Sequence, residues 1–179
     1  MAEFITFNEL KNIAAKYDTT MMLKEASTPS GKTVFLSHSS KDNDILPGVI
    51  KILEGHGGKV YVDVRDPELN GTDFTETADR LRKAVRICSK FVLLVTPRTK
   101  DSKWIPWELG IGDGDKRDLQ VSLFPSAEDA YEQKWSEQEY LGLYQRIVWG
   151  TFKNEEKPEW MVLDHRNNSG TKLGTWLRN

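Results

Sequence analysis

Short apolar runs alternate with amphipathic stretches along the first half of the chain. Three runs without polar alternation, 33–37, 59–63 and 90–95, are typical of strands covered on both faces. Between them, apolar residues recur every three or four positions over 45–56 and 74–85, which predicts two helices. Strand, helix, strand, helix, strand with short connections predicts a parallel α/β sheet.

The flanking segments are predicted in the same way. An amphipathic helix is expected over 3–23, followed by a turn-rich linker at 26–31. We therefore divide the chain into an N-terminal helix and linker, 1–31, and a core domain, 32–179. The second half predicts a helix over 102–111 with Pro106 in its first turn, a strand over 119–124, a helix that follows a capping box at 136–139 and continues through Ile147, a strand over 160–163 and a short helix over 173–177.

The turns that follow the three buried runs are the default ligand site. Right-handed crossovers bring the carboxyl ends of parallel strands to one edge of the sheet. Ligands of open α/β sheets bind beyond that edge. The turns 38–42, 63–73 and 96–104 are therefore expected to surround the site.

Composition excludes several classes of protein. The chain has 179 residues, 38% of them hydrophobic, and a net charge of −2, so it can build a core and lacks the basic excess of a dedicated nucleic-acid binder. The longest aliphatic run, 91–95, is too short to span a membrane, and the amino terminus has no signal-peptide pattern. The single cysteine, Cys88, fits a reducing compartment, so we expect a cytoplasmic protein.

The sequence predicts neither a metal site nor a bound cofactor. His38, His56 and His165 are far apart and show no zinc-ligand spacing. There is no phosphate-binding glycine loop of the Walker or Rossmann type, and the glycines of 110–114 are interpreted as a helix end.

Glu108 is the most informative acidic residue. A carboxylate in the first turn of a helix gains from the helix dipole, and this is its simplest interpretation. However, Glu108 also lies just beyond the third strand, and Trp104 precedes it by four residues, which puts an aromatic ring beside the carboxylate on a helix. Such a neighbour desolvates the carboxylate and offers a stacking surface for a heteroaromatic group.

Five motifs in register give the sequence a family resemblance. They are Val34-Phe-Leu-Ser-His-Ser-Ser-Lys-Asp42, Val60-Tyr-Val-Asp63, the 66–74 loop with Gly71, Phe91-Val-Leu-Leu-Val-Thr-Pro97, and Ser102-Lys-Trp104 with Glu108. Together they cover about residues 32–124 and resemble a bacterial TIR (Toll/interleukin-1 receptor) domain. The resemblance implies a flavodoxin-like parallel sheet with helices on both faces. Pro106 and the carboxy-terminal half depart from the family pattern.

The resemblance also implies an activity, because many TIR domains cleave NAD⁺ between nicotinamide and ribose. It assigns Glu108 as the catalytic carboxylate, which would stabilise the developing positive charge on the ribose, and Trp104 as the wall for the base. NAD⁺ would be a substrate, with no other cofactor. The remaining substrate-binding residues that we expect are Ser37, His38, Lys41, Asp63, Arg65 and Phe74, with the family's BB loop at 63–74.

Products and partners follow from the same resemblance. Attack by water would release ADP-ribose, whereas attack from within the same molecule would give a cyclic ADP-ribose isomer. Stand-alone bacterial members often supply such a messenger to a separate effector in antiphage, Thoeris-like systems, and TIR surfaces self-associate. Two alternatives stay open: a non-enzymatic TIR adaptor that self-associates through the BB loop, and a nucleoside deoxyribosyltransferase-like enzyme.

The six tryptophans all lie from Trp104 onward. We expect Trp104 to line the site and Trp107 to anchor its helix on the sheet. The other four are interpreted as packing residues: Trp135, Trp149, Trp160 and Trp176.

Overall fold

The computed structural model describes residues 2–28, 30–63, 74–102, 104–116, 118–130, 139–153 and 155–179. Within these ranges, eight strands form one sheet in the order β3-β2-β4-β5-β6-β7-β8, with β1 beside β5. The strands are β1 (Ile5–Thr6), β2 (Val34–Ser37), β3 (Val60–Tyr61), β4 (Lys90–Val95), β5 (Val121–Ala127), β6 (Gln145–Gly150), β7 (Glu159–Asp164) and β8 (Ser169–Lys172).

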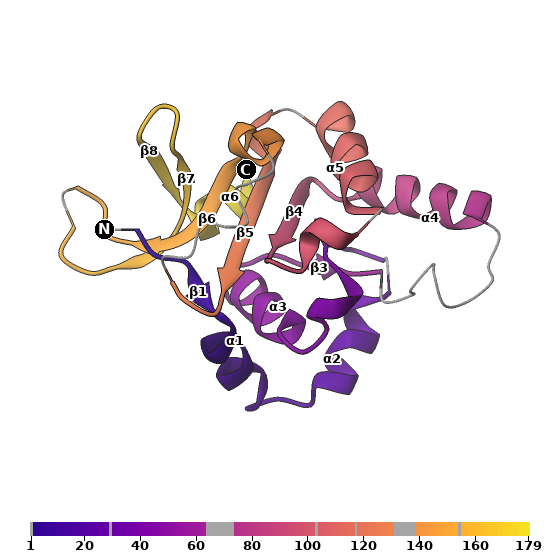
Figure 1. Ribbon diagram of the computed structural model, residues 1–179, viewed down its shortest axis with the longest axis horizontal. Coiled ribbons are helices and arrows are strands. Elements are labelled where there is room, and N and C mark those ends of the chain that lie inside the picture. The colour runs from indigo at the N-terminus through magenta and orange to yellow at the C-terminus, as the bar shows by residue number, and fades with distance from the viewer. Residues whose placement is uncertain are drawn as a thin grey trace.

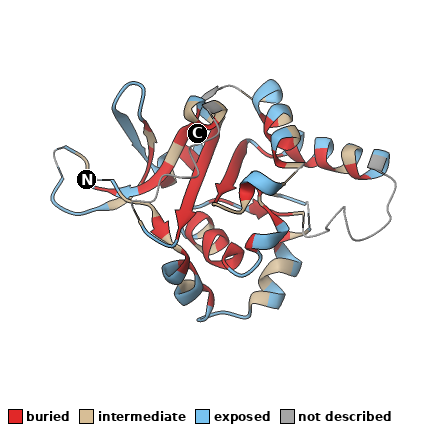
Figure 2. Ribbon diagram, viewed as in Figure 1, coloured by how far each residue is buried: buried red, intermediate tan, exposed pale blue. Residues whose placement is uncertain are grey.

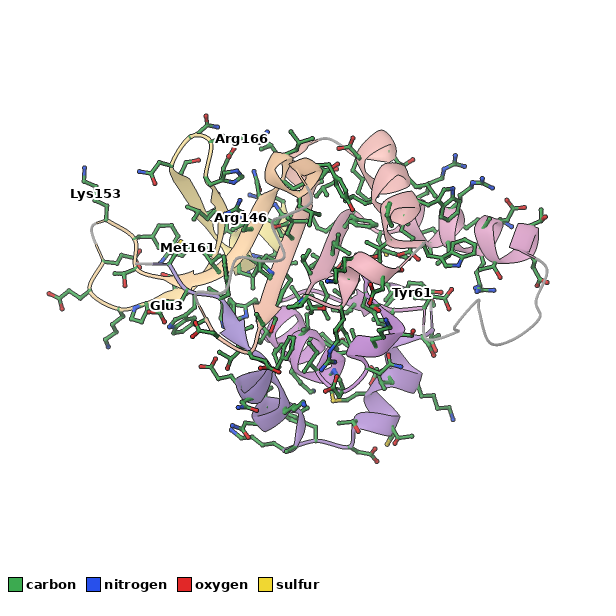
Figure 3. The ribbon with its side chains drawn as sticks, in the orientation of Figure 1. Glu3, Tyr61, Arg146, Lys153, Met161 and Arg166 are labelled. Carbon is green, nitrogen blue, oxygen red and sulfur yellow. The ribbon has the colours of Figure 1, made fainter. Side chains whose placement is uncertain are left out.

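Most of the sheet is parallel. Strands β1 to β6 pair in parallel, and β7 and β8 add an antiparallel extension. Figure 3 shows Arg146 on β6 and Arg166 at the turn that joins β7 to β8. The predicted α/β fold with a parallel sheet is confirmed.

Helices cover both faces of this sheet (Figure 1). They are α1 (Phe7–Ala14), α2 (Thr19–Ala26), α3 (Leu46–Gly55), α4 (Phe74–Ile87), α5 (Trp104–Asp115) and α6 (Leu173–Arg178). Side chains of α1, α3 and α6 share one apolar cluster with one face of the strands, and side chains of α4 and α5 share a second cluster with the other face. Figure 2 shows the central strands buried and β8 exposed.

The N-terminal segment differs from the single helix predicted over 3–23. It forms β1, then α1, then α2, because Asp18 caps a second helix by accepting a hydrogen bond from the Met21 amide. Thr6 and Glu9 form a capping box that starts α1 directly after β1. The division of domains at residue 31 stays a prediction.

The helix predicted to continue through Ile147 is wrong. A short 3₁₀ turn over Glu139–Leu143 is followed by β6, which pairs with β5 on one side and β7 on the other. Tyr140, Leu143 and Tyr144 owe their helical spacing to this turn. The capping box itself lies at 136–139, of which 136–138 are outside the described residues.

Other boundaries are close to the prediction. The strand over 90–95 and the helix starting at Phe74 are confirmed, and β5 begins two residues later than expected. The glycines of 110–114 lie inside α5 and do not end it. Gly112 allows this helix to approach the sheet, since a Cβ there would lie 2.7 Å from the Phe91 ring.

Candidate active site

Along the chain, the sheet grows from β2 in one direction to β3 and then in the opposite direction to β4, so the switch point lies between β2 and β4. β2 has β3 on one side and β4 on the other, and the chain then continues outward from β4 to β5 and β6. The carboxyl ends of the two strands at such a switch point form the crevice where α/β proteins bind ligands. Ser37 ends β2, and Val95 ends β4.

Glu108 lies beside the carboxyl end of β2, where it contacts Ser37. It sits on the second turn of α5, which begins at Trp104, and Ser102 starts the helix by accepting a hydrogen bond from the Ile105 amide at 3.3 Å. Pro106 therefore falls in the first turn, as predicted, where its missing N–H costs the helix no hydrogen bond.

The carboxyl group of Glu108 is buried and held by β2. The Ser37 hydroxyl donates to Glu108 Oε2 at 2.5 Å, and Glu108 is only 9% exposed. The pKa of Glu108 is raised to about 7: burial is the main cause, the Ser37 hydrogen bond opposes it, and the charge of Asp63 adds a smaller increase. Glu108 is thus a carboxyl group that can change its charge near neutral pH.

His38 and Asp63 lie beside this pair. Asp63 follows β3 and accepts two hydrogen bonds from Arg80 of α4, at 2.9 and 3.1 Å. Burial lowers the pKa of His38, whereas a backbone hydrogen bond to Leu36 and the charge of Asp63 raise it. The structure therefore brings together Ser37, His38, Asp63 and Glu108, which the sequence predicted as site residues.

Trp104 is half-buried at the start of α5, one helical turn before Glu108. Its ring meets the ring of Trp107 edge-on, with 5.4 Å between the centroids. Both rings pack against the buried cluster beneath α4 and α5, so Trp107 is the core contact that we predicted and Trp104 shares that role.

Lys41 points to a different neighbour. Its ammonium pairs with Asp101 at 2.8 Å, and both side chains are more than half exposed. Arg65 lies outside the described residues, as does most of the 63–74 loop, and of Phe74 only the backbone is described. The predicted contacts of Lys41, Arg65 and Phe74 with substrate stay predictions.

A buried clamp fixes the turn after β2. Asp42 is fully buried, and the Thr96 hydroxyl at the end of β4 donates to both of its oxygens, at 3.0 and 3.2 Å. Burial raises the pKa of Asp42 to about 6. Arg98 closes the clamp by donating to the Lys41 carbonyl at 2.6 Å and to Asp44 at 3.0 Å.

Sequence reasoning missed Arg80, Thr96 and Arg98. Each contacts a predicted loop residue from an element 17 or more positions away. The polar residues that follow a buried strand were the available signal for Thr96 and Arg98. Over the described ranges, no group of three histidine, cysteine or acidic side chains could hold a metal ion, and no helix there is long and apolar enough to cross a membrane.

Comparison with known proteins identifies the family. A family model described as TIR domain matches residues 34–161. A Bacillus cereus protein named "Probable 3' cyclic ADP-D-ribose synthase ThsB'" is 34% identical over 151 residues, which cover 83% of this chain and 77% of the relative. The match and the sheet order confirm the predicted resemblance: this chain belongs to the TIR domain family.

Proposed function

We propose that this protein cleaves NAD⁺ between nicotinamide and ribose and closes the ADP-ribosyl group into a cyclic ADP-ribose-type messenger. The observation that carries the proposal is the buried Glu108, held by Ser37 at the carboxyl ends of β2 and β4. The Bacillus cereus relative, which is named as a probable cyclic ADP-D-ribose synthase, supports a cyclic product.

The bond between nicotinamide and ribose would break with its electron pair leaving on nicotinamide. The pyridinium ring of NAD⁺ becomes neutral nicotinamide, so the departing base needs no proton. Positive charge develops on the ribose, and the Glu108 carboxylate stabilises it, as an oxocarbenium-like transition state requires. Trp104 would pack against the nicotinamide ring.

An atom of the same molecule would then attack the ribose. An adenine nitrogen or a ribose hydroxyl forms the new bond and gives a cyclic product, and an attacking hydroxyl passes its proton to the Glu108 carboxylate or to water. Water in the same role gives linear ADP-ribose. The Ser37 hydroxyl supports the charged form of Glu108 by donating a hydrogen bond to it.

We further propose that the product is a signal in antiphage defence, read by a separate effector protein, and that the TIR domain self-associates. These statements rest on the family resemblance.

The test is to incubate purified protein with NAD⁺ and to separate nicotinamide, ADP-ribose and cyclic products by chromatography. Wild type should release nicotinamide with a cyclic co-product, and Glu108→Gln should reduce release at least about a hundredfold, the range for loss of one group that stabilises transition-state charge. Glu25→Gln, at an exposed position on α2, is the matched control and should retain wild-type activity.

Equal release by wild type and Glu108→Gln would overturn the assignment of Glu108. The assay is run at low and at high protein concentration, so that an activity that requires self-association is also detected. Absence of release at every concentration would instead favour the non-enzymatic adaptor.

A further inference from the structure

Two carboxyl groups lie near the carboxyl ends of β2 and β3: Asp63, which follows β3, and Glu108 of α5, which contacts the last residue of β2. Phe35 of β2 pairs with Tyr61 of β3, and their rings lie 5.8 Å apart. Side chains two residues further along a strand return to the same face, so Ser37 lies on the face of the Phe35 ring, and Asp63 follows Tyr61, the last paired residue of β3, by two residues. Ser37 contacts Glu108 of α5, and Asp63 contacts Arg80 of α4. Each strand end is thus bonded to one of the two helices that cover this face.

Only one of these two carboxyl groups has a cation against it among the contacts that the structure describes. Both Nε and Nη2 of Arg80 donate to Asp63 Oδ2, and the side chains of the pair are 25% and 12% exposed. A partly buried ion pair is screened much less by solvent than an exposed one. Glu108 has a hydroxyl, Ser37, as its hydrogen-bond donor.

Groups from several elements affect the pKa of Glu108. Burial is the largest effect on its pKa, Ser37 of β2 opposes it, and Asp63 after β3 adds to it through its negative charge. His38, next to Ser37, is itself affected by the charge of Asp63. Arg80 of α4 acts through its bonds to Asp63. Like charges at one site oppose the ionisation of both groups.

We propose that Arg80 is a positioning residue for the reaction: it holds Asp63 in place and offsets part of its negative charge, so that Glu108 can ionise more easily. This inference rests on the proposed function, in which Glu108 acts as a carboxylate. The asymmetry gives the two acids different tasks, because the paired Asp63 stays structural and Glu108 is left for the substrate.

The first experiment measures kcat/KM for nicotinamide release between pH 5 and 9. In wild type the rate should rise as Glu108 ionises. In Arg80→Gln the loss of the Arg80 positive charge beside Asp63 should move this rise about one pH unit higher, which lowers the rate on the acid side about tenfold while the rate at pH 9 recovers.

Two variants separate charge from structure. Arg80→Lys restores the positive charge and should return the profile toward wild type. Arg86→Gln, on the same helix and in an exposed pair with Asp115 at 3.6 Å, should leave the profile unchanged. A profile for Arg80→Gln that keeps its midpoint, or that falls equally at every pH, would overturn the proposal.

A second measurement does not need activity. The ionisation of Glu108 is followed by ¹³C NMR of labelled glutamate carboxyl groups, with its signal assigned by its absence in Glu108→Gln. The midpoint should be higher in Arg80→Gln than in wild type, and equal midpoints would overturn the proposal. If the Glu108 midpoint is higher in Arg80→Gln than in wild type but the wild-type protein does not cleave NAD⁺, the result would contradict the proposed function and leave the role of Arg80 intact.

Discussion

Burial governs the chemistry of the two acids at the carboxyl edge of the sheet. Glu108 and Asp42 are both enclosed, and burial raises the pKa of each, to about 7 and about 6. Asp42 is held by the Thr96 hydroxyl within a structural clamp, whereas Glu108 is held by the Ser37 hydroxyl at the end of β2. The two acids therefore share an electrostatic cause and differ in role because of their partners.

The raised pKa of Glu108 predicts how stability depends on pH. The folded protein retains a proton that the unfolded chain releases, so this stabilisation is complete below the ordinary value of 4.5 and is lost as pH rises through about 7. A glutamine at position 108 does not ionise, so the Glu108→Gln variant does not lose this stability as the pH rises. It should therefore be more stable than wild type at pH 8, by up to about 3 kcal/mol, and close to wild type at pH 4.

Urea unfolding at pH 4 and pH 8 measures this difference. The Glu25→Gln variant, exposed on α2, should show no comparable change between the two pH values. A Glu108→Gln protein that loses the same free energy of unfolding as wild type on going to pH 8 would contradict the prediction.

The Asp42 clamp predicts the opposite effect for a substitution at Thr96. Thr96→Val keeps the shape of the side chain but removes the hydroxyl that donates to Asp42. The free energy of unfolding should fall by about 1–3 kcal/mol, the cost of leaving a buried acceptor unsatisfied. The loss should be larger at pH 8 than at pH 5, because the hydroxyl favours the charged form of Asp42. Thr171→Val, on the exposed strand β8, is the control for denaturant unfolding, and an equal loss there would refute the clamp.

Among the elements, α5 has the closest link between packing and the site. Gly112 faces the Phe91 ring of β4 at a distance that leaves no room for a Cβ, while Gly110 on the same helix faces open space. Because α5 also holds Glu108, its distance from the sheet sets the contact between Glu108 and Ser37.

Gly112→Ala should therefore reduce both stability and NAD⁺ cleavage. We expect a loss of about 1–3 kcal/mol in unfolding free energy from overpacking. Gly110→Ala should be stabilising by up to about 1 kcal/mol, since alanine favours a helix over glycine, and should leave cleavage intact. Thermal unfolding and nicotinamide release of the two variants test this, and equal behaviour would show that α5 does not need its close approach.

Elements with a strong local pattern could be predicted from the sequence. β2 and β4 each contain an unbroken apolar run, and α4 has apolar residues at regular helical spacing, so their secondary structure follows from neighbours in the chain. β6 could not be identified, because the apolar residues of the 3₁₀ turn before it continue into the strand at a spacing that also fits a helix. β1 has two residues, and its pairing depends on a partner far along the chain.

The site divides in the same way. Glu108, Trp104 and Ser37 belong to short motifs that a sequence displays directly. The ion pair of Arg80 with Asp63 depends on how α4 lies over β3, and the bond of Thr96 to Asp42 joins two loops 54 positions apart. Such contacts depend on the register of the sheet, which cannot be predicted from the sequence alone.

For the molecule as a whole, the N-terminal segment is part of the core. Leu10 of α1 is fully buried in the cluster that α3 shares with the sheet, and the Leu10 carbonyl packs so closely against Gly48 of α3 that a Cβ there would have no room. Arg98 and Lys11 both pair with Asp44, which links α1 to the loop after β2.

Leu10→Ala should therefore lower the unfolding free energy by about 2–5 kcal/mol, as for other large-to-small substitutions in a core. Met21→Ala on α2, where the side chain is 71% exposed, should change it by less than about 0.5 kcal/mol. Urea unfolding compares the two. Similar small losses would indicate that the N-terminal segment is an appendage and would support a division at residue 31.

The pairing of β1 with β5 has a consequence for how the chain folds during synthesis. The Ser126 hydroxyl donates to the Ile5 carbonyl across 121 positions, and Glu3 bridges to Trp149. A contact of such long range requires the closure of a large loop, and the entropic cost of this closure must be overcome before the contact forms. During synthesis β1 must therefore wait for β5 and β6, so that this segment reaches its native place long after it has been made.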